Sequence, residues 1–589
     1  MELSAQLLSQ TVLASKYLQP GETSIDQVLS RVACAVASAE RLEKQKHYEK
    51  IFFEHLKHGA IGAGRIMANA GRPGQATLMN CFVQPVGDSI SGHDKNGLPG
   101  IYEALREAAE TMRSGGGVGY DFSVIRPKGA WVTDMGAIAS GPCQFIDLFD
   151  ASASALQSVG ARRGAQMGVL RIDHPDILEF IAAKQTCGRW TNFNVSVAVS
   201  DAFIDSLQHD TTWSLVHSAR PGPEWIARGA LQRQFDGKWV YQSLPARAIW
   251  QSLLTAAYQV SEPSVLFTDQ INRDNNLHDS EVISATNPCG EQPLPAYGSC
   301  DLGPLILPRF VIHPFGRGGA TAFDFKKFIS STWLQVRMLD NVLDITDWPL
   351  AQQQTEAASK RRIGIGLTGL GDALIMLGLR YDRPEGRQMA AKIARTLRDT
   401  AYLASAELAR EKGPFPLFNA KTYLSDGTFA SRLPAAIKKQ IAVTGCRNSH
   451  LLSIAPAGSI SIAFADNTSN GIEPAFSWSY RRRIQERSGQ CHEISAENYA
   501  WRVYRTLFGL SAPLPPAFVC AHEIEARSHL AMMRTVQPFI DAGISKTINL
   551  PDDYPFSRFR ELYLLAWRYG LKGLSTFRFN PDREAVLLR

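Results

Sequence analysis

The nine cysteines of this chain include no CxxC pair. A zinc ribbon or a thioredoxin-type dithiol needs that spacing, and so few cysteines in 589 residues argue against a disulfide scaffold. The sequence also has no run of about 18 apolar residues to span a bilayer, and its N-terminus lacks the basic start and apolar stretch of a signal peptide. We therefore expect a cytoplasmic protein with no membrane partner and no metal site.

A concentrated basic stripe is also absent. The chain carries 62 Lys and Arg residues against 56 Asp and Glu residues, a net charge of +6. This mild excess suits an enzyme for anionic metabolites better than a protein that coats DNA or RNA. With 45% hydrophobic residues and no internal repeat, the chain is long enough for a large core and more than one domain.

One stretch, residues 286–303, reads TNPCGEQPLPAYGSCDLG. Cys289 stands between Asn287 and Glu291, and Cys300 follows. The prolines and glycines in this stretch exclude a regular helix or a central strand, so the thiol is presented on a shaped loop. Most cysteines are buried core thiols, and only neighbours of this kind indicate a reactive one.

The first part of the chain predicts helices. Residues 2–70 have apolar residues at helical spacing, and we expect two or three helices with Cys34 on an apolar face as a core thiol. Residues 78–83 are then predicted to form a short buried strand that carries Cys81. A helix is predicted next, within IYEALREAAETMRS, before the glycines at 115–119, which allow a close approach of backbone or ligand or simply form a tight turn.

Residues 144–185 predict two amphipathic helices that flank a loop from Ser158 to Ala165. Arg162 and Arg163 in this loop form either a phosphate grip or a solvated turn, and the sequence leaves both open. A strand is predicted from Asn192, helices between about 246 and 276, and a long helix in FDFKKFISSTWLQVRMLDNVLDI.

Two further motifs concern phosphate groups. Gly364, Gly366 and Gly369 spell GxGxxG, but no apolar strand precedes them, so we do not interpret them as a dinucleotide site. The segment PAGSIS after an apolar strand offers backbone N–H and hydroxyl donors suited to phosphate. Its residues are Ala457, Gly458, Ser459, Ile460 and Ser461.

Taken together, these segments resemble the ribonucleotide reductases, specifically the adenosylcobalamin-dependent class II enzymes. NPCGEQPL is highly specific for that family. The strings QATLMNCFV, GVGYDFSVIRPKGA, GARRGAQMGVLRIDHPDILEFI, NFNVSVAV, KRRIGIGLTGLGDAL and APAGSISI look like its other segments in the family's order, over roughly residues 60 to 580.

The resemblance implies roles for five residues. Cys289 would be the transient thiyl radical that removes the ribose 3′-hydrogen. Glu291 would act as general base on the 3′-OH while Asn287 hydrogen-bonds the ribose hydroxyls. Cys81 and Cys300 match the pair that supplies two reducing equivalents and ends as a disulfide.

The resemblance also implies binding sites. Residues 457–461 match the turn that holds the substrate phosphates, although threonines usually stand where this chain has Ala457 and Ser459. Asp88 and Arg126 match positions that contact a deoxynucleotide effector. The loop with Arg162 and Arg163 matches a flexible effector loop, and the helices near residues 145–185 resemble a homodimer interface.

The implied fold is a ten-stranded α/β barrel of two five-stranded halves, with the Cys289 loop threaded through its centre. We expect an N-terminal helical domain (residues 1–70), a barrel catalytic domain (71–540) and a C-terminal segment that completes the barrel (541–589).

The radical source implied by the resemblance is adenosylcobalamin. No Tyr-Tyr pair occurs to relay a radical from another subunit, and the tail KGLSTFRFNPDR looks like that of class II. The alternative is a class I-like catalytic subunit with a separate radical-generating subunit. A nucleotide-binding regulator without activity is the non-enzyme alternative, and the intact cysteine set speaks against it.

The sequence departs from the family at both ends. The last cysteine is Cys520, so the expected reductant is an external dithiol or a separate redox-tail polypeptide, with thioredoxin alone acting poorly. Before residue 70 there is no room for an ATP cone, so we expect no overall inhibition by dATP. The expected substrates are ribonucleotides, as diphosphates.

Overall fold

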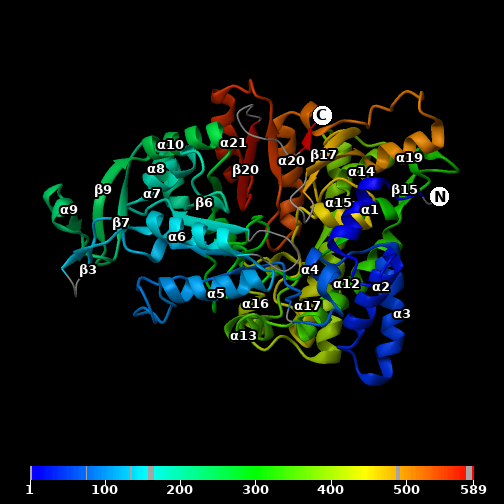
Figure 1. The fold of residues 1–589 in the computed structure, drawn as a ribbon, viewed down its shortest axis with the longest axis horizontal. Coiled ribbons are helices and arrows are strands. Elements are labelled where there is room, and N and C mark those ends of the chain that lie inside the picture. The colour runs from blue at the N-terminus through cyan, green and yellow to red at the C-terminus, as the bar shows by residue number, and fades with distance from the viewer. Residues whose placement is uncertain are drawn as a thin grey trace.

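The computed structural model describes residues 3–74, 76–132, 136–156, 165–485, 491–578 and 587–588. The chain begins with four helices, not the two or three that we predicted; they are α1 (Leu7–Lys16), α2 (Ile25–Ala37), α3 (Leu42–His58) and α4 (Gly64–Asn69). Helix α2 starts after Ser24, whose hydroxyl accepts a hydrogen bond from the Gln27 backbone N–H, so its beginning follows from capping. Figure 1 shows α1, α2 and α3 together at one end of the molecule.

The predicted burial of Cys34 is wrong. Cys34 is exposed, whereas the buried face of α2 consists of Val28, Leu29, Val32, Ala33, Val36 and Ala37. Successive residues of a helix point about 100° apart around its axis. Ala33 still lies within the buried apolar stripe, and Cys34, one residue later, lies outside it.

The largest sheet has seven strands, and Figure 1 labels two of them, β6 and β20. Its first five strands are mutually parallel, and β20 then runs antiparallel to β10 and parallel to β19. In spatial order the strands are β1 (Cys81–Val83), β2 (Gly117–Asp121), β5 (Gln166–Arg171), β6 (Phe193–Val199), β10 (Ser264–Phe267), β20 (Gly573–Arg578) and β19 (Thr547–Leu550).

A second group of extended segments continues the β structure. Strand β13 (Leu302–Ile306) pairs in parallel with β16 (Gly364–Thr368). Single parallel bridges then join Ile365 to Leu452 and Ile454 to Ile544. The protein is therefore a mixed α/β protein with an N-terminal helical region.

Helices flank both groups of strands (Figure 1). The buried side chains between them form two large hydrophobic cores. One core lies between the seven-stranded sheet and α5 (Ile101–Arg113), α6 (Pro142–Ala155), α7 (Ile177–Ala182), α8 (Asp201–Gln208), α10 (Ala246–Val260) and α21 (Phe556–Arg568). The other joins the N-terminal helices to β13, β16, α12 (Phe325–Ile345), α14 (Leu370–Met376), α15 (Pro384–Lys412), α17 (Ala435–Thr444) and α20 (Ala526–Val536).

Several predicted elements are confirmed, including the helix α5, the strand β6 and the long helix α12. The strands that were missed include two within segments that we predicted to be helical. Strand β5 lies between the predicted helix pair, and β10 lies within the predicted helical region 246–276. Both are short and buried, and buried parallel strands lack the alternation that marks a strand in sequence.

The GxGxxG string does not form a nucleotide-binding turn. Gly364 and Gly366 lie inside β16 itself. A Cβ atom on Gly366 would stand 2.3 Å from the Ser453 carbonyl oxygen, so this glycine lets two backbones pack closely.

Two smaller sheets lie outside these two groups of strands. One three-stranded sheet comprises β7 (Thr212–His217), β9 (Trp239–Pro245) and β8 (Leu231–Gln232). In another, β17 (Ser479–Gln485) pairs with β18 (Cys491–Glu497) and with β21 (Leu587–Leu588). Across the part of the chain that the structure describes, no helix is both long enough and apolar enough to cross a membrane.

Candidate active site

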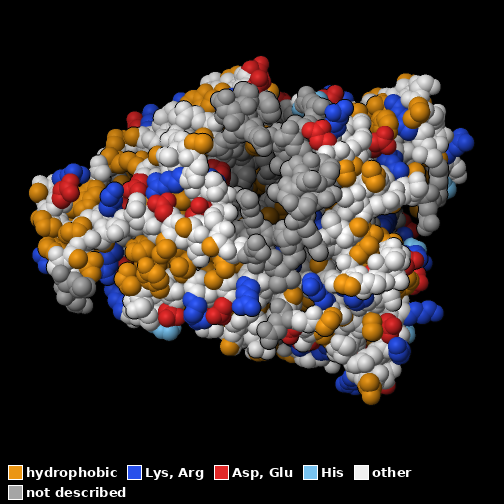
Figure 2. All heavy atoms as spheres, in the orientation of Figure 1, with side chains coloured by type: hydrophobic (Ala, Val, Ile, Leu, Met, Phe, Trp, Pro, Cys, Tyr) orange, Lys and Arg blue, Asp and Glu red, His pale blue; other side chains and the backbone are white. Residues whose placement is uncertain are grey.

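The Cys289 loop is a tight finger between two short strands. Strand β11 (Ala285–Thr286) pairs antiparallel with β12 (Pro293–Leu294). Asn287 closes the loop, because its backbone N–H donates to the Gln292 carbonyl (3.2 Å) and its Oδ1 accepts from the Gln292 N–H (2.9 Å). Cys289 at the tip is exposed and lines a pocket of about 240 Å³. Figure 2 shows a hollow near the middle of the drawn face.

Glycines of strand β2 make room for this finger. A Cβ atom on Gly119 would stand 1.9 Å from the Thr286 carbonyl oxygen, and one on Gly117 would stand 3.1 Å from the Pro288 ring. The glycine-rich stretch was left open between a close approach and a plain turn. The structure shows a close approach, between the finger and β2.

Cys81 and Cys300 meet beside the finger. The Cys300 N–H donates to the Cys81 carbonyl (2.9 Å), and the neighbouring residues Phe82 and Ser299 form an antiparallel bridge. The two thiols are in hydrogen-bond contact, and burial, with the Cys81 thiol next in importance, raises the pKa of Cys300 well above its ordinary value. Cys81 lines the pocket at 9% exposure, whereas Cys300 lies behind it at 1%.

Glu291 is buried at 2% exposure and still contributes to the pocket lining. Burial raises the pKa of its carboxyl from 4.5 to about 7, and a backbone hydrogen bond within Glu291 opposes this rise. Among the described residues, Glu291 Oε2 and Asn287 Nδ2 have no hydrogen-bond partner. An acceptor and a donor without partners at one pocket are suited to the hydroxyl groups of a ligand.

We expect the pH dependence of catalysis to follow the carboxyl of Glu291. Only the ionised form accepts a proton, so with a pKa of about 7 the rate should rise with pH, about tenfold per unit below pH 7, and level off above it. A profile of kcat over this range checks this. Glu291→Gln should lose both the rising limb and most of the rate, and a wild-type rate that is flat from about pH 5.5 to 8.5 would contradict the assignment.

The PAGSIS segment opens on the same pocket. Ala457 has a left-handed backbone (φ 55°) and precedes helix α18 (Gly458–Phe464). Four of its five predicted residues line the pocket: Ala457, Gly458, Ser459 and Ile460. Ser461 does not; its buried hydroxyl lies 2.8 Å from that of Thr368 and donates to the Ala457 carbonyl.

The predicted effector residues lie elsewhere. The guanidinium Nε of Arg126 donates to both carboxylate oxygens of Asp88, at 3.0 and 3.1 Å, so the structure brings this pair together. Neither residue lines the Cys289 pocket. Arg162 and Arg163, with the loop before Ala165, lie outside the described residues.

The sequence reasoning missed part of the pocket. Asn80, next to Cys81, and Arg65 of α4 both line it, and the Asn80 side chain accepts a hydrogen bond from the Arg65 N–H (3.1 Å). Nothing in the string GRIMAN marks Arg65, because a single arginine in a short helix is ordinary. Only the packing of α4 against β1 reveals it.

Two family models match this chain. The family model described as "Ribonucleotide reductase, all-alpha domain" matches residues 3–75, and the one described as "Ribonucleotide reductase, barrel domain" matches residues 79–577. The second match covers Cys81, Cys300, the finger and helix α18.

Individual proteins match over most of their length. The "Vitamin B12-dependent ribonucleoside-diphosphate reductase" of Mycobacterium tuberculosis strain CDC 1551 is 32% identical over all of this chain and 81% of its own length. The protein of the same name from Thermoplasma acidophilum is 32% identical over 87% of this chain and 64% of its own length. An Arabidopsis thaliana "Ribonucleoside-diphosphate reductase large subunit" is 28% identical over 89% of this chain and 70% of its own length.

Proposed function

Because this chain belongs to the ribonucleotide reductase family, we propose that the Cys289 pocket converts ribonucleoside diphosphates to 2′-deoxyribonucleotides by thiyl-radical chemistry. One observation carries the proposal. A solvent-reachable thiol, a buried carboxyl with a pKa of about 7 and a second thiol in contact with a third converge on one pocket.

Each of these groups has one role in the reaction, and the atoms and electrons of the whole reaction balance. The Cys289 thiyl takes the 3′-hydrogen atom, and Glu291 takes the proton of the 3′-OH while Asn287 Nδ2 donates to a ribose hydroxyl. The 2′-OH leaves as water, and Cys81 and Cys300 give up two protons and two electrons to become a disulfide. The 3′-hydrogen then returns from Cys289, so one ribonucleotide and two thiols yield one deoxyribonucleotide, one disulfide and one water.

Adenosylcobalamin is the radical source that we propose. When bound, it supplies an organic radical that removes the hydrogen atom from the Cys289 thiol. The exposed sulfur of Cys289 fits a radical that arrives from outside the chain, and Pro288 and Pro456 offer apolar surface in the same pocket. The names of the two 32% identical relatives and the absence of a Tyr-Tyr pair favour this source.

The relative from Arabidopsis favours the alternative source. It is named as a large subunit, so a separate radical-generating subunit is the second candidate for this chain. The exposed Cys289 thiol would receive the radical in either case, but this sequence has no Tyr-Tyr pair to relay it from a second subunit.

The finer architecture is part of the proposal. One half of a ten-stranded barrel is formed by the five parallel strands β1, β2, β5, β6 and β10. The other half is formed by β20, β19, the segment around 452–454, β16 and β13. The bridges from Ile365 to Leu452 and from Ile454 to Ile544 support this order. The Cys289 finger would occupy the centre.

Effector binding and dimer formation are proposed for the seven-stranded half. The Asp88–Arg126 pair, together with the loop that carries Arg162 and Arg163, would contact the deoxynucleotide effector. An outward row on α6 supports a homodimer through the 145–185 region, because Phe145 and Leu148 are half-buried and Ala151 is exposed. Figure 2 shows hydrophobic side chains gathered over this helix.

The decisive experiment is an anaerobic and aerobic assay of the purified chain with a ribonucleoside diphosphate and a small dithiol. Deoxynucleotide should form with adenosylcobalamin alone, in the presence of oxygen, and not without it. Activity that requires a second protein instead would support the subunit-dependent alternative. No deoxynucleotide under either condition would refute the proposed reaction.

A further inference from the structure

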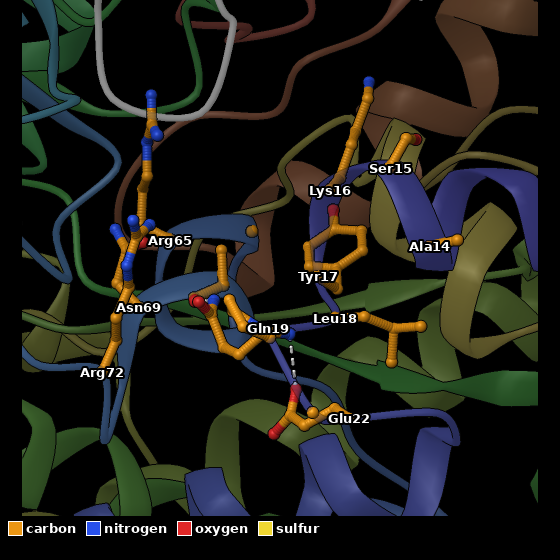
Figure 3. Close-up of a pocket in the computed structure, with 14 residues that line it drawn as sticks. Ala14, Ser15, Lys16, Tyr17, Leu18, Gln19, Glu22, Arg65, Asn69 and Arg72 are labelled. Atoms are coloured by element: carbon orange, nitrogen blue, oxygen red, sulfur yellow. Dashed lines mark hydrogen bonds between the residues drawn. The ribbon is translucent and has the colours of Figure 1, made fainter. Parts of the chain in front are cut away.

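A second cavity lies beside the Cys289 pocket, and none of its lining was predicted from the sequence. It measures about 530 Å³ and lies between residues 14–22, at the end of α1, and helix α4 with Arg72 after it. Gly64 and Arg65 line both cavities. Figure 3 shows Arg65 and Arg72 along one wall, Lys16 and Tyr17 on the other, and Glu22 at the bottom.

A hydrogen bond joins a residue that lines one cavity to a residue that lines the other. The buried hydroxyl of Tyr17, which lines the larger cavity, lies 2.7 Å from the Ser459 hydroxyl, which lines the Cys289 pocket. The Tyr17 ring also contacts Phe464 of α18 with its edge, at a centroid distance of 4.9 Å. The larger cavity therefore lies next to the PAGSIS turn, with Tyr17 in contact with both.

The larger cavity is cationic. Lys16, Arg65 and Arg72 line it, and its one acidic lining residue among those described is Glu22. The Glu22 carboxylate already accepts hydrogen bonds from Arg31 Nε (2.7 Å) and the Gln19 N–H (2.8 Å). The Glu22 carboxylate is therefore already paired with Arg31, and the other charged residues of the lining, Lys16, Arg65 and Arg72, are all basic.

Arg65 is placed to serve both cavities. Its backbone is held by Asn80, and its guanidinium lies over Gly115, where a Cβ atom would stand 2.8 Å from Arg65 Cζ. A residue with a side chain at 115 would displace the guanidinium, so the glycine keeps the space for it. The PAGSIS turn itself supplies dipoles and hydroxyls but no cation, and a diphosphate carries several negative charges.

We propose that Arg65 and Lys16 bind the phosphate furthest from the ribose of the substrate nucleotide, which extends from the PAGSIS turn past Ser459 into the cationic cavity. This inference rests on the proposed function and assigns these two residues as specificity determinants for that same site. A nucleotide without a terminal phosphate would leave the cavity unfilled. A separate anion, such as free pyrophosphate, is the other source of the same chemistry.

The test compares the dissociation constants of cytidine, cytidine monophosphate and cytidine diphosphate by calorimetry, without cofactor or reductant so that no turnover occurs. In the wild type the diphosphate should bind more tightly than the monophosphate. Arg65→Gln should reduce that preference roughly 10- to 100-fold while cytidine binding stays unchanged, because one charge-assisted contact is lost. Lys16→Gln should act in the same direction, and Arg65→Lys should restore part of the preference.

Arg41→Gln provides the matched control. Arg41 is an exposed arginine of the same helical region, just before α3, and lines neither cavity. Its substitution should leave all three constants unchanged. Thermal unfolding of each variant shows whether the fold is retained.

Three outcomes would overturn the inference. An unchanged diphosphate preference in Arg65→Gln would refute it while leaving the proposed function intact. Pyrophosphate binding that is lost in Arg65→Gln, with the nucleotide preference kept, would assign the cavity to a separate anion. No binding of any cytidine nucleotide by the wild type would refute both this inference and the proposed function.

Discussion

Cys289→Ser should abolish deoxynucleotide formation, with a loss on the order of 10⁴-fold or more in kcat. A serine O–H bond is much stronger than the ribose C–H bond, so an alkoxyl radical is not formed under conditions that produce a thiyl. Because Cys289 is exposed at the tip of the finger, replacing sulfur by oxygen changes no core packing. The measurement is deoxynucleotide formation per chain under saturating substrate, cofactor and dithiol.

Cys34→Ser and Cys187→Ser are matched controls, because both residues are exposed cysteines outside the pocket. Both variants should keep the wild-type rate. Cys289→Ser should also bind the substrate with an unchanged dissociation constant, which separates loss of chemistry from loss of the site. Residual turnover of a few per cent in Cys289→Ser would contradict a role as the hydrogen-atom carrier.

The second large effect is expected at the cysteine pair. Cys81→Ser and Cys300→Ser should each lower steady-state turnover on the order of 10³-fold, since one thiol alone cannot supply two reducing equivalents and form a disulfide. The wild-type chain, reduced and then freed of dithiol, should form about one deoxynucleotide and lose two hydrogens in mass. Cys446→Ser is the control, because Cys446 is also fully buried but lies outside the pocket.

The geometry also sets the order of disulfide reduction. Cys81 lines the pocket and Cys300 lies behind it, so an incoming thiolate should attack the Cys81 sulfur and release the Cys300 thiolate. In Cys300→Ser, a small disulfide reagent should therefore leave its mixed disulfide on Cys81, as peptide mapping by mass spectrometry would show. Labelling of Cys300 in Cys81→Ser at the same rate would contradict this order.

The sequence predicted those helices and strands that are specified by residues within or next to them. The start of α2 follows from Ser24, and α12 follows from its long run of apolar residues at helical spacing. The predicted burial of Cys34 was wrong because the sequence pattern shows an apolar stripe but not where its edges lie. Strands β5 and β10 were missed because burial on both faces removes the alternation from their sequences.

The sequence by itself indicated the family, through the motif around Cys289 and the segments that accompany it, and the chemistry that we propose follows from the family. Its glycines and prolines also determined that the thiol lies on a finger. Only the tertiary structure decided the environment of each group. The pKa of Glu291 reflects burial, and the contact of Cys81 with Cys300 arises from the pairing of β1 with the segment before β13. Likewise, Arg65 reaches the pocket because α4 packs beside β1, and no string of residues encodes long-range contacts of this kind.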